Sequence, residues 1–189
     1  MFENEKFDEV INVLKRGELI LYPTDTIWGI GCDATNEDAI EKILRLKGRA
    51  ASKGLILLVD SVEMLKKYVN HVHPRVQTLL EYHMRPLTVI YDKSKGVAPN
   101  ALAPDGSVAI RITRDPFCRN LIAQFGKPIV STSANISSQP FPAHFGEISS
   151  DIFEGVDFVV KYKQESKERG EPSVIARLGK DEELEFIRD

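Results

Sequence analysis

The sequence predicts an α+β fold with α/β-like alternation, in which helices flank one twisted, mixed β-sheet in a single domain, residues 1–189. Two observations predict it. Short runs of aliphatic and β-branched residues alternate along the chain with segments whose apolar residues recur at helical spacing. Hydrophobic residues make up 42% and charged residues 28% of the chain, a composition typical of globular proteins, without an internal repeat or linker.

The alternation begins at the N-terminus. Apolar residues between positions 7 and 14 recur at helical spacing, and Gly17 suits the C-terminus of that helix. The strand LILY follows (residues 19–22). A second helix begins at Thr35 or Asn36, either of which suits an N-cap, and ends at Gly48.

The middle of the chain continues the pattern. GLILLV (residues 54–59) is continuously apolar, which predicts a strand covered on both faces. Ser61 opens a short helix, and Pro74 occupies the first position of the next one. LTVIY (residues 87–91) and SVAIRI (residues 107–112) are then predicted to be strands.

The last third predicts one helix and several short strands. Asp115 and Pro116 begin a helix that Gly126 closes. PIVS (residues 128–131) is a short strand that leads into TSANISSQP, a loop rich in hydroxyl groups. VDFVV, SVIAR and LEFI are predicted to be the closing strands.

Composition excludes several classes of protein. No apolar run approaches the roughly 20 residues that a membrane helix needs, and the acidic, amphipathic N-terminus is unlike a secretory signal. The two cysteines have no metal-ligand spacing and fit a reducing cytoplasm, so we expect a cytoplasmic protein without a membrane partner. A net charge of −3 argues against a protein that coats nucleic acid through bulk charge.

Several segments match known functional motifs but lack the flanking residues that those motifs require. GIGCDA (residues 29–34) matches a loose dinucleotide pattern, but six residues separate it from the preceding strand and no acid follows at the required distance. His71 and His73 lack a third metal ligand, so a surface turn before Pro74 is the better interpretation. Cys118 is expected in the core. No serine lies in a nucleophile elbow.

Two pairs of polar residues remain. Lys47 and Arg49 flank Gly48, where the helix ends, so both can point toward one anion such as a phosphate. Ser133 and Asn135 follow a strand, at the edge where open sheets bind ligands. Each pair alone is equally compatible with an ordinary helix end and an ordinary turn.

Taken together, these motifs resemble the YrdC-type L-threonylcarbamoyladenylate synthases in their short bacterial form. The resemblance covers nearly the whole chain, in the order and spacing of the family. The matching segments are YPTDTIWGIGCDA, LKGRAASKGLILLV, RPLTVIY, VAIRIT, PIVSTSANISSQP and PSVIAR. It implies a YrdC/RibB-like domain with a concave, basic ligand cleft, beside which Gly29 and Gly31 let the chain turn tightly.

The resemblance also implies a reaction. L-threonine captures bicarbonate as CO2, and the resulting carbamate attacks the α-phosphate of ATP to give threonylcarbamoyl-AMP and pyrophosphate. Because the nucleophile is the substrate, such a site needs cations and positioned hydroxyls rather than a protein nucleophile. ATP arrives with Mg2+, without protein metal ligands or a prosthetic group. A partner transferase then modifies tRNA.

Site residues follow from the matching motifs. The resemblance assigns the nucleotide, with charge stabilisation by the first two residues, to Lys47, Arg49, Lys53, Ser107, Ser133 and Asn135. It assigns L-threonine to Thr26, Arg111, Ser131 and Ser173, with Thr24 and Thr88 as further candidates. Arg111 alternates with two isoleucines, so its side chain points either to water or into the cleft.

The chain departs from the family pattern at three places. Residues 82–86 read YHMRP where the family has W-P-G-P, Trp28 replaces a tyrosine or phenylalanine, and residues 168–172 lack a Gly-Gly pair.

Two rival functions remain compatible with the sequence. One is a double-stranded RNA-binding or ribosome-maturation factor of the same fold, and the other is a paralogue that has lost synthase activity.

Overall fold

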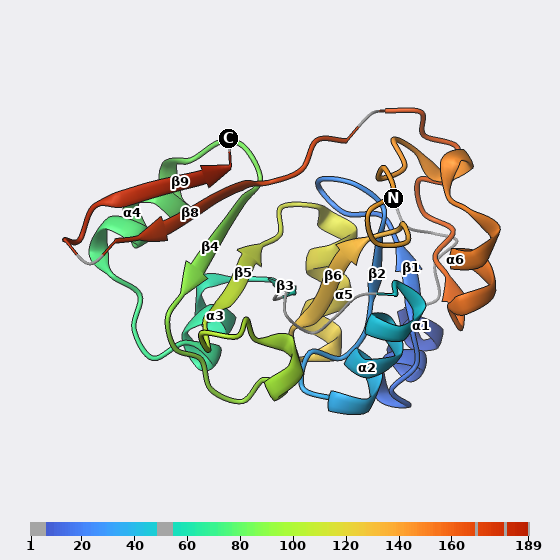
Figure 1. Ribbon diagram of the computed structural model, residues 1–189, viewed down its shortest axis with the longest axis horizontal. Helices are drawn as coiled ribbons and strands as arrows, with labels where there is room; N and C mark the ends of the chain where they lie inside the picture. Colours follow the sequence, from blue (N-terminus) through green and yellow to red (C-terminus); the bar gives the residue numbers. More distant parts are fainter. Residues whose placement is uncertain (1–6, 49–54, 169, 180, 189) are drawn as a thin grey trace.

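The computed structural model describes residues 7–48, 55–168, 170–179 and 181–188, and within them nine strands form one mixed sheet (Figure 1). The strands are β1 (Ile20–Tyr22), β2 (Gly29–Gly31), β3 (Ile56–Val59), β4 (Leu87–Tyr91), β5 (Val108–Ile112), β6 (Ile129–Ser133), β7 (Phe158–Val159), β8 (Val174–Leu178) and β9 (Leu184–Arg188). Their order across the sheet is β7-β1-β2-β6-β3-β5-β4-β8-β9. Pairs β1–β7, β3–β5 and β4–β8 are parallel, and the others are antiparallel.

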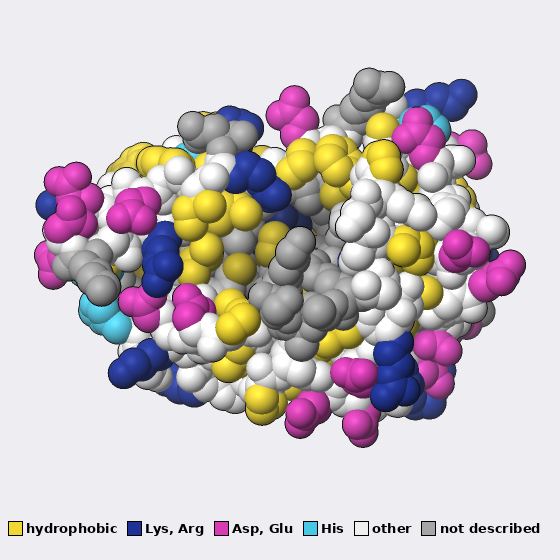
Figure 2. Space-filling view, viewed as in Figure 1, with side chains coloured by type: hydrophobic (Ala, Val, Ile, Leu, Met, Phe, Trp, Pro, Cys, Tyr) yellow, Lys and Arg dark blue, Asp and Glu magenta, His cyan; other side chains and the backbone are white. Residues whose placement is uncertain are grey.

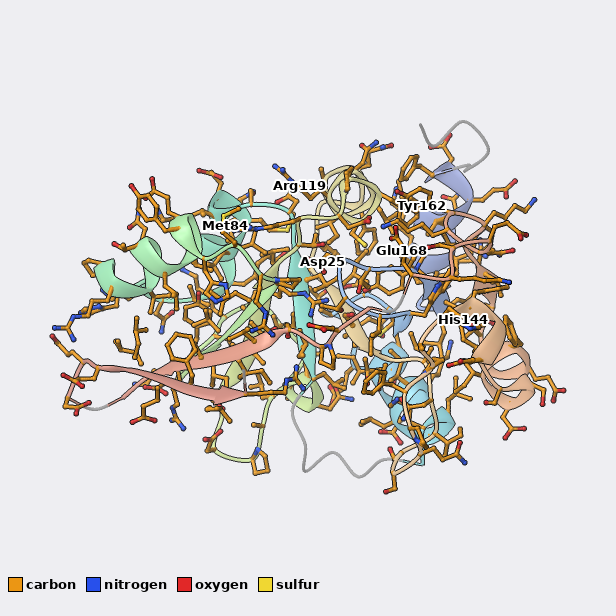
Figure 3. The ribbon with its side chains drawn as sticks, turned by 90° about the horizontal axis from the view of Figure 1, so that it is seen from above. Asp25, Met84, Arg119, His144, Tyr162 and Glu168 are labelled. Atoms are coloured by element: carbon orange, nitrogen blue, oxygen red, sulfur yellow. The ribbon has the colours of Figure 1, made fainter. Side chains whose placement is uncertain are left out.

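Helices cover one face of this sheet more fully than the other. The helices are α1 (Phe7–Lys15), α2 (Glu37–Leu46), α3 (Val62–Tyr68), α4 (Pro74–Tyr82), α5 (Pro116–Phe125) and α6 (Ser150–Gly155), with 3-10 turns η1 (Pro99–Ala101) and η2 (Phe145–Glu147). Figures 1 and 3 agree that α1, α3, α4 and α5 lie on one face, whereas α2 lies on the other. None of the described helices covers the part of that second face formed by β3, β4, β5 and β8, which is called the open face below.

The helix boundaries follow the predicted signals. Asn36, rather than Thr35, caps α2, because its Oδ1 accepts a hydrogen bond from the Ala39 N–H at 3.0 Å. Ser61 caps α3 in the same way, and Asp115 caps α5. Gly126 ends α5 in the left-handed region, with φ at 79°.

The G-x-G segment corrects one prediction. We expected these glycines to form a turn, but Gly29–Gly31 is strand β2, paired with β1 on one side and β6 on the other. Glycine is needed here for close approach. A Cβ on Gly31 would lie 2.6 Å from the Tyr22 ring and 2.9 Å from the Val130 carbonyl oxygen. The fully buried Tyr22 ring occupies this space, and its hydroxyl donates to the same carbonyl at 3.1 Å.

Two strand lengths also differ from prediction. β6 continues through Ser133 because Thr132 and Ser133 pair with β2, so the first residues of the predicted loop belong to the sheet. β7 contains only Phe158–Val159. In β3, Leu57, Leu58 and Val59 are fully buried as predicted, whereas Ile56 is partly exposed on the open face.

Candidate functional site

A cavity of about 450 Å3 occupies the open face of the sheet, a size typical of small-molecule sites. Figure 2 shows that this face is hollowed near its middle, with hydrophobic and basic side chains around the hollow. The described polar residues in its wall are Thr26, Ser107, Arg111, Ser131, Thr132, Ser133, Ser173 and Arg188. Among the described lining residues there are two arginines and no carboxylate, so the lining favours anionic ligands.

Strand register brings these side chains together. Ile56 of β3 lies beside Ala109 of β5 and Ser131 of β6, and Ala109 lies beside Ile90 of β4. Neighbouring residues of paired strands share a face, so the four side chains form one floor. The floor is largely apolar and becomes polar toward Ser131.

Arg111 points into the cleft rather than to bulk water. Its side chain is 3% exposed, and its Nη2 lies 3.3 Å from Oδ1 of Asp25, which is itself buried. The same nitrogen donates to Oγ1 of Thr26 at 3.2 Å. Arg111 lines the cavity, but its Nε is buried and has no hydrogen-bond partner among the described residues.

The predicted threonines of the PTDT segment form one chain of hydrogen bonds. The hydroxyls of Thr24 and Thr26 are 2.8 Å apart, and the Thr24 hydroxyl donates to the Ile27 carbonyl at 2.8 Å. Thr26 lines the cavity, whereas Thr24 lies behind it and lines a neighbouring cavity of about 260 Å3. Thr24 therefore supports Thr26 through the contact between their hydroxyls, and Thr26 is the one of the two that lines the large cavity.

A second chain joins Thr88, Ser173 and Arg188. Thr88 is fully buried beside Arg111 in the register of β4 and β5, and its hydroxyl lies 2.8 Å from that of Ser173. Arg188 donates through Nε to the Ser173 carbonyl at 2.9 Å and through Nη2 to its hydroxyl at 3.3 Å. Partial burial, and then the nearby positive charge of Arg111, lower the pKa of Arg188.

Lys47, Ser133 and Asn135, which the resemblance assigned to the nucleotide, lie close together in the structure. Lys47 is 2% exposed, and its Nζ donates to the carbonyl oxygens of Ser133 and Asn135 at 2.5 and 2.6 Å. The Asn135 side-chain amide donates to the Gln139 carbonyl at 2.6 Å. These contacts of Lys47 and Asn135 therefore hold the loop after β6 in shape.

Three remaining predicted residues have different outcomes. Arg49 and Lys53 lie outside the described residues. Ser107 lines the cavity, and its hydroxyl donates to Oδ1 of Asp105 at 2.6 Å, a hydrogen bond that lowers the pKa of that carboxyl group.

Sequence reasoning missed two residues. Asp25 carries a weak sequence signal, because it lies between two threonines of the PTDT segment. Arg188 carries no signal, because it is one charge among several near the end of the chain, and only the pairing of β9 with β8 brings it to the cavity.

The rejected motifs remain outside this site. Within the described ranges, no group of three or more His, Cys, Asp or Glu residues is placed to hold a metal ion. Cys118 is fully buried as predicted, and burial raises the pKa of its thiol well above the usual range. No described helix is long and apolar enough to cross a membrane.

Comparisons with known proteins agree with this fold. The sequence profile of the Sua5/YciO/YrdC family, described as "Telomere recombination", matches residues 12–189. A protein of Vibrio parahaemolyticus named threonylcarbamoyl-AMP synthase is 36% identical over 174 residues, covering 90% of this chain and 93% of the relative.

Solved structures give the same result for the fold. The crystal structure of P. abyssi Sua5 complexed with L-threonine has a TM-score of 0.78 and 26% identity. It covers 91% of this chain, which spans only about half, 50%, of the Sua5 chain. E. coli YciO has a TM-score of 0.83 at 21% identity, with 97% of this chain and 88% of YciO covered.

Proposed function

The chain belongs to the Sua5/YciO/YrdC family, and from this membership we propose that it is an L-threonylcarbamoyladenylate synthase. It makes threonylcarbamoyl-AMP and pyrophosphate from L-threonine, bicarbonate and ATP, which makes it a nucleotidyltransferase. The observation that carries the proposal is the cavity, whose described lining combines two guanidinium groups, several hydroxyls and an apolar floor without a carboxylate.

The geometry near Arg111 supports the amino-acid end of this site. A guanidinium in the cavity wall suits the carboxylate of L-threonine, which it can bind through two parallel N–H groups. Thr26, Ser131 and Ser173 also line the cavity and offer hydroxyls to the polar groups of the substrate. The L-threonine complex of the related Sua5 supports the same substrate class.

The rest of the cavity suits the nucleotide. Ile56, Ile90 and Ile175 offer an apolar surface for a purine ring, and Ser107 lies at the same wall. Ser133 and Arg188 supply a hydroxyl and a positive charge for phosphate oxygens, and Arg49 and Lys53 are proposed to add to that charge. Lys47 and Asn135 maintain the loop that presents Ser133.

These groups fit adenylyl transfer. The substrate carbamate oxygen attacks the α-phosphorus of ATP, the bond to the bridging oxygen of the β-phosphate breaks, and pyrophosphate leaves. The positive charges stabilise the developing negative charge, and the hydroxyls position both substrates. Mg2+ enters as part of the ATP substrate, bound by phosphates and water, because the described cavity lining lacks carboxylates.

The next step in the proposal is transfer of the threonylcarbamoyl group to tRNA by a partner enzyme in the cytoplasm. Curated relatives named as synthases favour this function over a ribosome-maturation factor without synthase activity.

Product identification tests the proposal. Purified protein is incubated with Mg2+, ATP, L-threonine and 13C-bicarbonate, and the nucleotides are analysed by mass spectrometry. The expected product is an AMP adduct that carries one threonine and one 13C carbon. Unmodified AMP and ADP as the only nucleotide products would contradict it.

A further inference from the structure

Asp25 has no role in the function described so far, although its buried carboxylate contacts Arg111 of the cavity wall. Its side chain is 8% exposed. Oδ2 accepts a hydrogen bond from the backbone N–H of Arg114 at 3.0 Å, which fixes the carboxylate at the end of β5. Figure 3 places Asp25 near the middle of the molecule, between the part that carries Met84 and the part that carries Glu168.

The other oxygen of Asp25 faces Arg111. Oδ1 lies 3.3 Å from Nη2 of Arg111, and it has no hydrogen-bond partner among the described residues. Asp25 is absent from the lining of the large cavity, whereas Arg111 is part of it. The carboxylate therefore reaches the guanidinium from outside the cavity.

The contacts of Arg111 are distributed unevenly. Asp25 and Thr26 both contact Nη2, whereas the Nε of the same group is buried and has no hydrogen-bond partner in the described part of the chain. Because a guanidinium is planar and rigid, contacts on one nitrogen fix the direction of the others. We infer that Asp25 is a positioning residue, which holds the buried side of the Arg111 guanidinium so that the part that lines the cavity faces the carboxylate of the amino-acid substrate.

This inference rests on the proposed function. It predicts that removal of a negative charge near the site weakens the binding of the anionic substrate. Removal of the Asp25 charge, considered alone, strengthens the attraction of Arg111 for an anion. Loss of orientation has the opposite effect, since a binding group misplaced by about 1 Å costs up to about 100-fold. Weaker binding of L-threonine therefore reports on position and not on charge.

The first experiment measures L-threonine binding by calorimetry. Asp25→Asn is expected to raise the Kd for L-threonine about 10- to 100-fold while the Kd for ATP changes less than about 3-fold. Asp33→Asn is the matched control, because the Asp33 side chain is also buried, at 6% exposed, and pairs with Lys127 at 2.7 Å outside the cavity lining. Unchanged or tighter L-threonine binding by Asp25→Asn overturns the inference.

A double variant covers the case in which Asp25→Asn leaves the buried charge of Arg111 without its partner and the protein no longer folds. Asp25→Asn/Arg111→Met removes both charges. If Asp25 acts through Arg111, the double variant binds L-threonine no more weakly than Arg111→Met alone. A further loss of 10-fold or more shows an independent role for Asp25 and overturns the inference.

An NMR readout needs no substrate and separates this inference from the proposed function. The Arg111 Nε–H signal, identified by its absence in Arg111→Met, is expected to exchange slowly with water in the wild type and at least 10-fold faster in Asp25→Asn. Equal exchange in both proteins overturns the positioning role. Slow exchange in a wild type that does not bind L-threonine leaves positioning intact and refutes the proposed substrate.

Discussion

The ammonium group of Lys47 lies 2.6 Å from the carbonyl oxygen of Asn135, a residue 88 positions later in the chain. Together with the contact to the Ser133 carbonyl, this places a buried positive charge beneath the loop that follows β6. Lys47 of the first polar pair thus directly contacts both residues of the second pair, Ser133 and Asn135.

Replacement of Lys47 tests the importance of its contacts with Ser133 and Asn135. Lys47→Met keeps the length of the side chain but removes the donor to two carbonyl groups, so the loop loses its shape. We expect a loss of about 2–4 kcal/mol of transition-state stabilisation, about 30- to 1000-fold in kcat/KM. Steady-state pyrophosphate release is the measurement.

Lys42→Met is the matched control for Lys47. Lys42 also belongs to the α2 region and donates to a backbone carbonyl, that of Gly17 at 2.7 Å, outside the cavity lining. Its replacement is expected to leave kcat/KM within about 3-fold of wild type. Equal losses in the two variants would show that any lysine of this helix matters only for stability.

A second prediction concerns the close approach in β2. Gly31→Ala forces a Cβ against the Tyr22 ring and the Val130 carbonyl, at 2.6 and 2.9 Å. We expect the free energy of unfolding to fall by about 1–3 kcal/mol, the usual cost of overpacking. Urea denaturation measures it.

Gly146→Ala controls for glycine replacement in general. A Cβ there meets no atom closer than 3.5 Å, so the free energy of unfolding is expected to stay within about 0.5 kcal/mol of wild type. If Gly31→Ala proved as stable as this control, the packing explanation for the G-x-G segment would be wrong.

This segment also marks where sequence reasoning reached its limit. Helix caps such as Asn36, Ser61 and Asp115 were predictable, because capping depends on a few adjacent residues. Strand β2 was not, because glycine has low strand propensity and only contact with Tyr22 and β6 explains it there.

The site residues also divide into those that local motifs predict and those that depend on contacts between distant segments. The resemblance of motifs identified Thr26, Arg111, Ser131 and Ser173, which line one cavity in the structure. It did not predict the Asp25–Arg111 pair or the position of Arg188, because both depend on side chains that meet across the sheet. Contacts between distant segments leave little local signal in a single sequence.

A third prediction concerns the two cysteines. Cys32 and Cys118 are fully buried, and burial raises the pKa of both thiols. Native protein at pH 8 is therefore expected to react with less than about one tenth of a thiol equivalent of Ellman's reagent, and denatured protein with both thiols. Rapid reaction of either cysteine in the native protein would contradict the described burial.

The raised thiol pKa values also fix the sign of a pH effect. Above the ordinary thiol pKa of about 8.5, the unfolded chain releases protons that the folded chain retains. This contribution to stability is fully present below that pH and is lost as the pH rises further. In Cys32→Ser/Cys118→Ser, the fall in stability between pH 8 and pH 10 is expected to be smaller than in wild type, as thermal denaturation at several pH values can check.

A fourth prediction concerns the metal. If Mg2+ enters only with ATP, excess EDTA abolishes pyrophosphate release, but the melting temperature without nucleotide stays within about 1 °C. A large fall in melting temperature would point to a structural metal site instead.

Threonine-dependent pyrophosphate release from ATP tests the central claim most directly. In the presence of Mg2+ and bicarbonate, the account predicts that L-threonine raises the rate at least 10-fold and that D-threonine does not. The same rate with and without L-threonine would contradict the account.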